Sequence, residues 1–161
     1  MFFAFRLWDD LKDIDHDRSH HAHRILCRTR FVPQFQTLCR VLLATSCLAL
    51  VAAWQLTAVT AYAVTVIALW FWYDFRDRFH RTGAWYYHIL LLKYPGIVIA
   101  VASSISGQWS GTIFKYAVVA YLLVCVAEVL HDVRLQARFV NRVLAISEAF
   151  VLSMLVVDLA R

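Results

Sequence analysis

The feature that most limits how this chain can fold is a long run without charge. From Val41 to Tyr73 no residue is charged. At about 1.5 Å per residue, one helix over this run would be about 50 Å long, whereas the hydrocarbon core of a bilayer is about 30 Å thick. The run therefore predicts two membrane-spanning helices, with a turn near residues 55–57.

Composition and three further apolar segments extend this interpretation to the rest of the chain. Hydrophobic residues make up 61% of the sequence, compared with roughly 45–50% in soluble domains. Segments 85–103, 112–130 and 143–159 are each close to the length of a span, and Pro95 predicts that the first of them is bent or starts late. We therefore expect an all-α polytopic membrane helix bundle with about five transmembrane helices.

The distribution of basic residues predicts the orientation of this bundle. Segments 1–40, 76–93 and 134–142 carry all but two of the 16 lysines and arginines, and a five-span topology places all three on one side. Because basic residues in short loops stay inside, this side is predicted to be cytoplasmic. The net charge of +5 suits contact with anionic lipid or a phosphate substrate and gives no indication of nucleic-acid binding.

No linker or repeat divides the sequence, so we expect a single membrane domain over residues 1–161. Within it, residues 1–35 form a cytoplasmic acidic and basic helix end with its loop. Residues 36–161 hold the five spans. The uncharged turns on the opposite side offer few groups for chemistry, which places any active site on the cytoplasmic side.

Three carboxylates near the start of the chain have a spacing typical of one helical face. Asp9, Asp13 and Asp17 lie four residues apart. Like charges in such a row repel one another, and a hard divalent ion that bridges to phosphate would relieve the repulsion. The pattern predicts a site for Mg²⁺ and diphosphate. The alternative is a solvated acidic face that Lys12 and Arg18 neutralise.

A second acidic pair lies at the predicted cytoplasmic end of the fourth span. Glu128 and Asp132 are again four residues apart, and the topology brings them to the same side of the membrane as the first acidic run. The alternative is that they pair with Arg134 or Arg138 at the helix end.

These runs resemble the signatures of the UbiA superfamily of intramembrane prenyltransferases. The run Asp9-Asp-Leu-Lys-Asp13-Ile-Asp-His-Asp17-Arg18, followed by Arg24, is similar to the motif Asn-Asp-x-x-Asp-x-x-x-Asp and the later Arg-Pro of that family. The pair Glu128 and Asp132 falls where the family has its second Asp-x-x-x-Asp. The segment 73–78, Tyr-Asp-Phe-Arg-Asp-Arg, resembles the Tyr-Pro-Phe-x-Lys-Arg of the family.

The resemblance implies a function and a set of roles. It implies Mg²⁺-dependent transfer of a prenyl group from an isoprenoid diphosphate to a small-molecule acceptor. Its implied catalytic residues are Asp13, Asp17 and Asp132. The implied metal ligands are Asp9, Asp13, Asp17, Glu128 and Asp132, and the implied diphosphate-binding residues are Arg24, Arg76 and Arg78. Aromatic rings at 70–73 and 85–87 would stabilise an allylic cation or else form an interfacial belt.

The chain departs from the family at several places. Asp9 stands for an Asn, Glu128 for an Asp and Ile25 for the proline. The chain lacks counterparts of the family's first helix, most of its second helix and its last one or two helices. This implies a shortened member or one completed by another membrane subunit. The alternative function is therefore a non-catalytic membrane subunit or inactive fragment that retains the fold. A CDP-alcohol type of lipid enzyme is disfavoured because its aspartate motif is absent.

The remaining polar residues inside or near the spans have simpler interpretations. The four cysteines, at 27, 39, 47 and 125, lack metal-type spacing and are interpreted as reduced, buried packing residues. The histidines at 16–23 would need several further clustered histidines to form a metal site, so contact with phosphate or headgroups is favoured. Glu148 lies inside the fifth span and is expected to face a partner, either Lys115 or a helix supplied from outside this chain, and no catalytic role is assigned to it.

Overall fold

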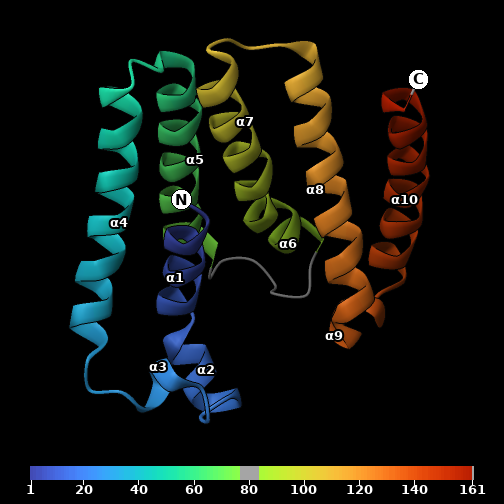
Figure 1. Ribbon diagram of the computed structural model, residues 1–161. Coiled ribbons are helices and arrows are strands. Elements are labelled where there is room, and N and C mark those ends of the chain that lie inside the picture. Colours follow the sequence, from blue (N-terminus) through green and yellow to red (C-terminus); the bar gives the residue numbers. More distant parts are fainter. Residues whose placement is uncertain (77–83, 161) are drawn as a thin grey trace. The chain divides into compact units, whose positions relative to one another are not determined.

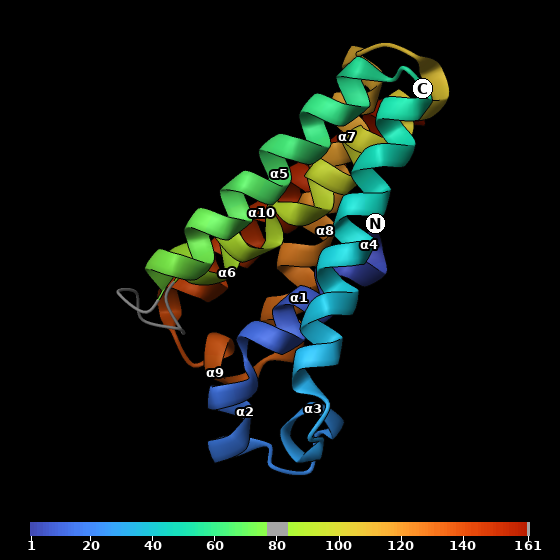
Figure 2. The same cartoon turned by 90° about the vertical axis from the view of Figure 1, so that its left-hand side faces the viewer.

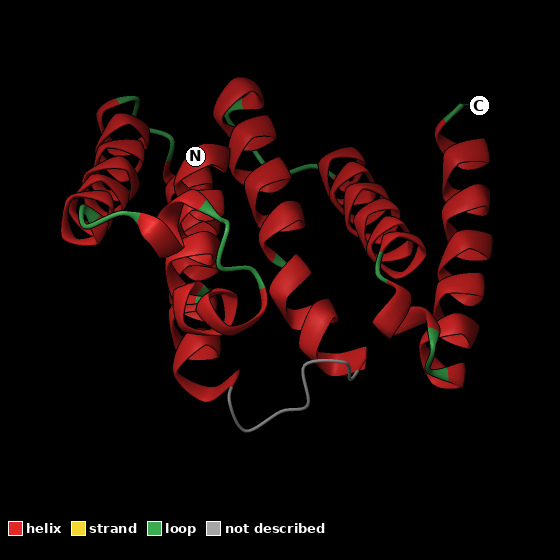
Figure 3. Cartoon of the chain, turned by 90° about the horizontal axis from the view of Figure 1, so that it is seen from below, coloured by secondary structure: helices red, strands yellow, loops and turns green. Residues whose placement is uncertain are grey.

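The computed structural model describes residues 1–76 and 84–160, and within these ranges the chain is helical and has no strand (Figure 1, Figure 3). Its helices are α1 (Phe2–Lys12), α2 (Ile14–His20), α3 (Ile25–Arg28), α4 (Val32–Ala52), α5 (Leu56–Phe75), α6 (Ala84–Leu91), α7 (Lys93–Ser106), α8 (Gly111–His131), α9 (Val133–Gln136) and α10 (Phe139–Leu159). Five helical stretches are long and apolar enough to cross a membrane, namely Val32–Ala52, Leu56–Phe75, Tyr86–Ser106, Gly111–His131 and Phe139–Leu159. The chain is therefore an all-α polytopic membrane protein, as predicted.

Two compact units make up the fold, Met1–Trp54 and Gln55–Arg161. The first contains α1 to α4 and the second contains α5 to α10. The acidic run 9–17 thus belongs to the first unit, and the pair Glu128 and Asp132 belongs to the second. That residues 1–161 act as one membrane domain stays a prediction.

In the first unit, α1 and α2 form an almost continuous helix that packs beside α4. Asp13 lies between α1 and α2, yet its backbone N–H donates to the carbonyl of Asp9 (3.0 Å) and its carbonyl accepts from the N–H of Asp17 (2.8 Å). The thiol of Cys39 on α4 donates to the carbonyl of Ala4 on α1 (3.6 Å), and both residues are buried. Figure 2 shows α2 and α3 at the end of this unit where α4 begins. Helical hydrogen bonding thus passes through the acidic run.

The first span starts earlier, and the following turn lies earlier, than the sequence predicted. Helix α4 begins at Val32 with Pro33 in its first turn, where a missing N–H costs nothing, and it includes the exposed Arg40. The chain turns at residues 53–55, where Trp54 adopts a left-handed backbone with φ of 55°. Gln55 thus lies in the turn, as predicted, whereas Thr57 lies in α5, which begins at Leu56.

The second unit is built on a row of long helices, in which α7 packs against α5 and α8, and α8 packs against α10 (Figure 1). The contact between α5 and α7 is close at Gly96. A Cβ atom placed on Gly96 would lie 2.0 Å from Thr65 Oγ1, so only glycine permits this approach. Close contact through small residues is a common way for helices to associate in a membrane.

The third span consists of two helices. It is interrupted at Leu92, between α6 and α7, three residues before Pro95. A proline ring clashes with the carbonyl four residues earlier, here that of Leu91, and supplies no N–H for it. The expected bend at Pro95 is thus confirmed. Helix α7 ends at Ser106 and is followed by Gly107, whose φ of 74° suits glycine. Helix α8 begins after Ser110, whose hydroxyl accepts the N–H of Ile113 (3.2 Å).

Candidate functional site

The acidic residues of the first unit lie on the helix formed by α1 and α2. Asp9 and Asp17 are both buried, at 6% and 5% exposure, and Asp13 between them is half-buried. Their spacing along continuous helical hydrogen bonds puts them on one face. This agrees with the expectation that a shared face carries the three carboxylates.

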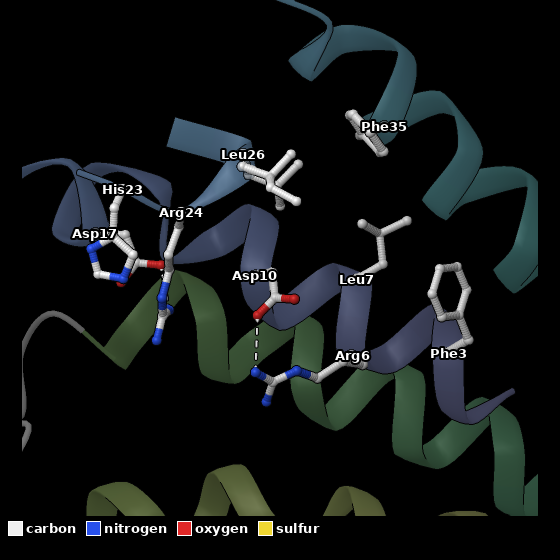
Figure 4. A pocket seen from close by; sticks show the side chains of 10 residues that line it. Phe3, Arg6, Leu7, Asp10, Asp17, His23, Arg24, Leu26 and Phe35 are labelled. Atoms are coloured by element: carbon white, nitrogen blue, oxygen red, sulfur yellow. Dashed lines mark hydrogen bonds and ion pairs between the residues drawn. The ribbon is translucent and has the colours of Figure 1, made fainter. Parts of the chain in front are cut away.

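A cavity of about 700 Å³ lies in the first unit beside this helix (Figure 4). It is lined by two kinds of side chain. Its polar lining consists of Arg6, Asp10, Asp17, His23 and Arg24, and its apolar lining consists of Phe3, Leu7, Ile25, Leu26 and Phe35. Figure 4 shows Asp17, His23 and Arg24 together at one end and Phe3 and Phe35 at the other. The pocket therefore has the amphiphilic character that a charged head with an apolar tail would need.

Ion pairs organise the polar part of the pocket. Arg24 Nη1 lies 2.6 Å from Asp17 Oδ2, and Arg6 Nη2 lies 3.3 Å from Asp10 Oδ1. The Asp17 side chain is 7% exposed, whereas that of Arg24 is 47% exposed. The carboxylate is thus held inside while its guanidinium partner reaches toward solvent.

Asp10 differs electrostatically from its neighbours. Partial burial raises the pKa of the Asp10 carboxyl, and the positive charge of Arg6 opposes this rise. Negative charge at Asp9 and Asp17 raises the pKa further. Ionisation of Asp10 is therefore unfavourable beside the other carboxylates, and a bound cation would make it more favourable.

The structure distributes the predicted residues of the first unit unevenly over the pocket. Asp17 and Arg24 line it, and Asp9 and Asp13 are not among its lining residues. Asp10, which the sequence interpretation left out, does line it. Of the two cations in the alternative interpretation, Arg18 pairs with Asp15 (3.3 Å).

The second acidic pair lies where α8 passes into α9. Glu128 is exposed and Asp132 is half-buried. One carboxylate oxygen of Asp132 accepts the backbone N–H of Arg134 at 2.7 Å, which caps α9 in the usual way. The alternative interpretation expected side-chain pairing with Arg134 or Arg138, whereas Asp132 accepts from the Arg134 backbone.

Of the predicted arginines of the second unit, Arg76 is described and Arg78 lies outside the described residues. Arg76 is buried, at 6% exposure, and its guanidinium lies over the ring of Tyr73, 5.2 Å from the centroid. Trp72 is also buried and its ring meets that of Tyr86 edge-on (5.4 Å). These two rings belong to the core, whereas Trp70 is exposed.

The second unit also contains a polar cluster that the sequence interpretation missed. His88, Cys125 and Glu148 each offer a ligand atom within 4.8 Å of the other two, and within the described parts of the chain they are the one such group of three. The expected partner of Glu148 was wrong, since Glu148 faces His88 (3.2 Å) and Lys115 pairs with Asp158. The three residues lie on α6, α8 and α10, so no local spacing signals them.

The cysteines are all free, as expected, but they are not all buried. Cys39 and Cys125 are buried, and Cys27 and Cys47 are half-buried. The error arose for Cys47 because a residue inside a span can still face the lipid.

In the histidine-rich segment 16–23, the rings of His21 and His23 meet edge-on at 6.1 Å, and His23 lines the pocket of the first unit.

Comparison with protein-family models, with curated proteins and with solved structures finds no match to this chain.

Proposed function

We propose that this chain is a Mg²⁺-dependent intramembrane prenyltransferase of the UbiA type, which transfers a prenyl group from an isoprenoid diphosphate to a small-molecule acceptor. The observation that carries the proposal is the pocket of the first unit. It joins Asp10, Asp17 and Arg24 to an apolar end, and an isoprenoid diphosphate has the same two parts. The spacing of the acidic run and its resemblance to the family motif support the same donor.

The donor set of the first unit suits Mg²⁺. Mg²⁺ takes oxygen ligands, keeps several waters and is commonly held by one or two carboxylates together with substrate phosphates. In this proposal Asp13 and Asp17 hold such an ion, Asp9 supports them from the same helical face, and the ion neutralises charge on the diphosphate. The second-unit residues Glu128 and Asp132 hold a second ion, as the resemblance implies.

The arginines would bind the diphosphate. Arg24 pairs with Asp17 at 2.6 Å and is half-exposed. When a cation occupies Asp17, the guanidinium is released from its carboxylate and becomes available for fork-like contacts with phosphate. Arg76 and Arg78 take the same role in the second unit. The apolar wall, which includes Phe3 and Phe35, would hold the prenyl chain.

Binding of the donor tests this proposal directly. The full chain, purified in detergent, is heated with a non-hydrolysable prenyl diphosphate, with and without Mg²⁺. We expect the diphosphate to raise the melting temperature only when Mg²⁺ is present. Asp13→Asn and Asp17→Asn should each abolish the rise, because each removes a charged ligand.

Asp15→Asn is the matched control. Asp15 lies on the same helix, its side chain is 96% exposed and it pairs with Arg18 outside the pocket, so this variant should keep the full shift. Equal shifts in all three variants would overturn the two-part donor site. No shift in the unmodified chain would favour the alternative, a non-catalytic membrane subunit that retains the signature.

The proposal includes an orientation and partners. The segments rich in Lys and Arg face the cytoplasm, and the donor site lies on that side with them. The partners are the bilayer, the isoprenoid diphosphate, the acceptor and a second membrane subunit that supplies further helices. Migration of the protein from its native membrane as a hetero-complex would support the last of these, and migration as a lone monomer would contradict it.

A further inference from the structure

The cluster on α6, α8 and α10 brings together three different ligand types. His88 Nε2 lies 3.2 Å from Glu148 Oε1, and His88 Nδ1 lies 3.5 Å from Cys125 Sγ. The Cys125 side chain is fully buried, and those of His88 and Glu148 are 17% and 12% exposed. Cys125 belongs to a hydrophobic cluster that includes Leu91 and Val129. The carboxylate and the thiol thus lie at different nitrogens of one imidazole, and one ligand atom from each of the three residues lies within 4.8 Å of the other two.

One carboxylate oxygen of the cluster lacks a partner among the described residues. Glu148 Oε1 faces His88, but Glu148 Oε2 is buried and has no hydrogen-bond partner within the described structure. A carboxylate oxygen buried without a partner is costly, and the cost is larger inside a membrane. The hydroxyl of Tyr87, next to His88, is likewise buried without a partner. A bound cation would satisfy the carboxylate.

Charge balance inside the span also favours a divalent cation. A neutral imidazole, a thiolate and a carboxylate together carry two negative charges, and a divalent ion makes the total zero. A neutral total is what a low-dielectric surrounding requires of buried charged groups. On Cys125 the thiol proton would be lost to water as the metal–sulfur bond forms, since the thiolate is the form that binds metal.

The geometry and the choice of ligands point to zinc. Zn²⁺ binds Cys, His and carboxylate at about 2.0–2.3 Å, which places the ligand atoms of a tetrahedron about 3.3–3.7 Å apart. The three ligand atoms here lie within 4.8 Å of one another, so side-chain movements of about 1 Å close the site. The hydroxyl of Tyr121 lies 2.9 Å from His88 Nδ1 and 3.4 Å from the His88 carbonyl. It therefore orients the imidazole, as hydrogen-bond partners of metal-bound histidines do, and leaves Nε2, the nitrogen that faces Glu148, for the ion.

We propose that His88, Cys125 and Glu148 form a Zn²⁺ site within the membrane-spanning helices, with three protein ligands and an open fourth position. Three protein ligands and an exchangeable fourth are characteristic of zinc sites that act on a bound molecule or water, whereas structural sites use four protein ligands. The site lies wholly in the second unit and does not depend on the donor pocket of the first unit. Cys125 is about 9 Å from the His131 end of α8 at 1.5 Å per residue, so the ion would lie near that end of the span.

Cobalt binding provides the test, because Co²⁺ substitutes for Zn²⁺ and a cobalt–thiolate bond adds a charge-transfer absorption in the near ultraviolet. The full chain is purified in detergent, stripped of metal and titrated with Co²⁺ and then with Zn²⁺. We expect one Co²⁺ per chain, a thiolate band, and loss of this band as Zn²⁺ displaces the cobalt. Cys125→Ser should remove the band, and Glu148→Gln should weaken Co²⁺ binding by more than about tenfold.

Cys47→Ser is the matched control, since Cys47 is a half-buried cysteine on another span and this variant should keep the band. A band that survives Cys125→Ser, or uptake that never saturates, would overturn the site. X-ray absorption of the zinc-loaded unmodified chain gives a second readout that needs no variant. One sulfur at about 2.3 Å with nitrogen and oxygen at about 2.0–2.2 Å is expected, and a shell without sulfur would contradict the proposal.

Discussion

At the scale of residues, the buried carboxylates of Asp17 and Glu148 lie beside two different kinds of basic side chain. Asp17 is paired with Arg24, whose charge is permanent. Glu148 faces His88, whose charge depends on its protonation. Asp17 therefore has a cation beside it at every pH at which the protein is folded, whereas Glu148 depends on a proton or on a bound ion. The charge of Asp17 is therefore balanced without any ligand, whereas the charge of Glu148 is balanced only by a proton or a bound cation.

Asp10 allows a test of pH dependence at one residue. Its pKa is raised above the ordinary value of 3.8, chiefly by burial, so the folded chain holds this proton more tightly than the unfolded chain. As the pH rises above 3.8, the unfolded chain ionises first, and the free energy of unfolding falls until folded Asp10 has ionised too. We expect the free energy of unfolding of Asp10→Asn to lack this contribution to the decrease with pH.

The measurement is chemical unfolding in detergent from about pH 3 to about pH 7, a range that begins below the ordinary carboxyl values and ends well above them. Asp15→Asn serves as the control, because its exposed side chain leaves Asp10 unchanged and the fall should persist. Identical pH profiles for the unmodified chain and Asp10→Asn would show that Asp10 titrates alike in the folded and unfolded states.

At the scale of elements, the packing of α7 against α5 depends on one missing side chain. A Cβ on Gly96 would lie 2.0 Å from Thr65 Oγ1 and 2.9 Å from Thr65 Cβ. Thr65 is itself fixed, because it is buried and its hydroxyl donates to the carbonyl of Ala61 (2.8 Å). The clash involves a restrained side chain, so relief requires the helices to separate.

We therefore expect Gly96→Ala to lower the free energy of unfolding by about 1–3 kcal/mol, the usual cost of overpacking a core. Thr65→Ala removes the nearest hydroxyl and methyl and should restore part of the loss in the double variant. Gly111→Ala is the control, since a Cβ there meets nothing within 4 Å. Thermal denaturation in detergent compares these variants with the unmodified chain. An unchanged melting temperature in Gly96→Ala would contradict this packing.

The sequence predicted the spans well and the polar contacts only in part, for a physical reason. Apolar length is a local property, so the uncharged run after Val41 and the bend at Pro95 could be recognised from neighbouring residues alone. The face of a helix is local too, which is why the spacing of Asp9 and Asp17 was informative. Contacts between helices are not local: His88 and Glu148 are far apart in the sequence, and only packing of α6 with α8 and α10 brings them together.

At the scale of the whole molecule, the arrangement of charge around the spans determines how the chain lies in a bilayer. The turn at 107–110 between α7 and α8 contains no charged residue, whereas the segment before α4 contains many. A topology with the basic segments inside places Cys27 in the cytoplasm and Gln108 outside. These two positions can be compared in intact cells.

We expect a membrane-impermeant thiol reagent to label Gln108→Cys in intact cells when the native cysteines are replaced by serine. A chain that keeps only Cys27 should be labelled after permeabilisation and not before. Each of the two chains carries a single cysteine, so their expression and folding can be compared directly. The reverse labelling pattern would mean that the basic segments face outward, and it would contradict the proposed orientation of the donor site.

The pairing of α10 with earlier helices has a consequence for biosynthesis. Its two acidic residues face partners that precede it in the chain, because Glu148 faces His88 and Asp158 pairs with Lys115. An isolated acidic residue near the centre of a helix opposes membrane insertion by about 2.5–3.5 kcal/mol. When α10 leaves the ribosome, the side chains that pair with its two acidic residues have already been made. The helix therefore enters the bilayer at low cost only after α6 and α8 have entered, so that the order of translation is also the order of assembly.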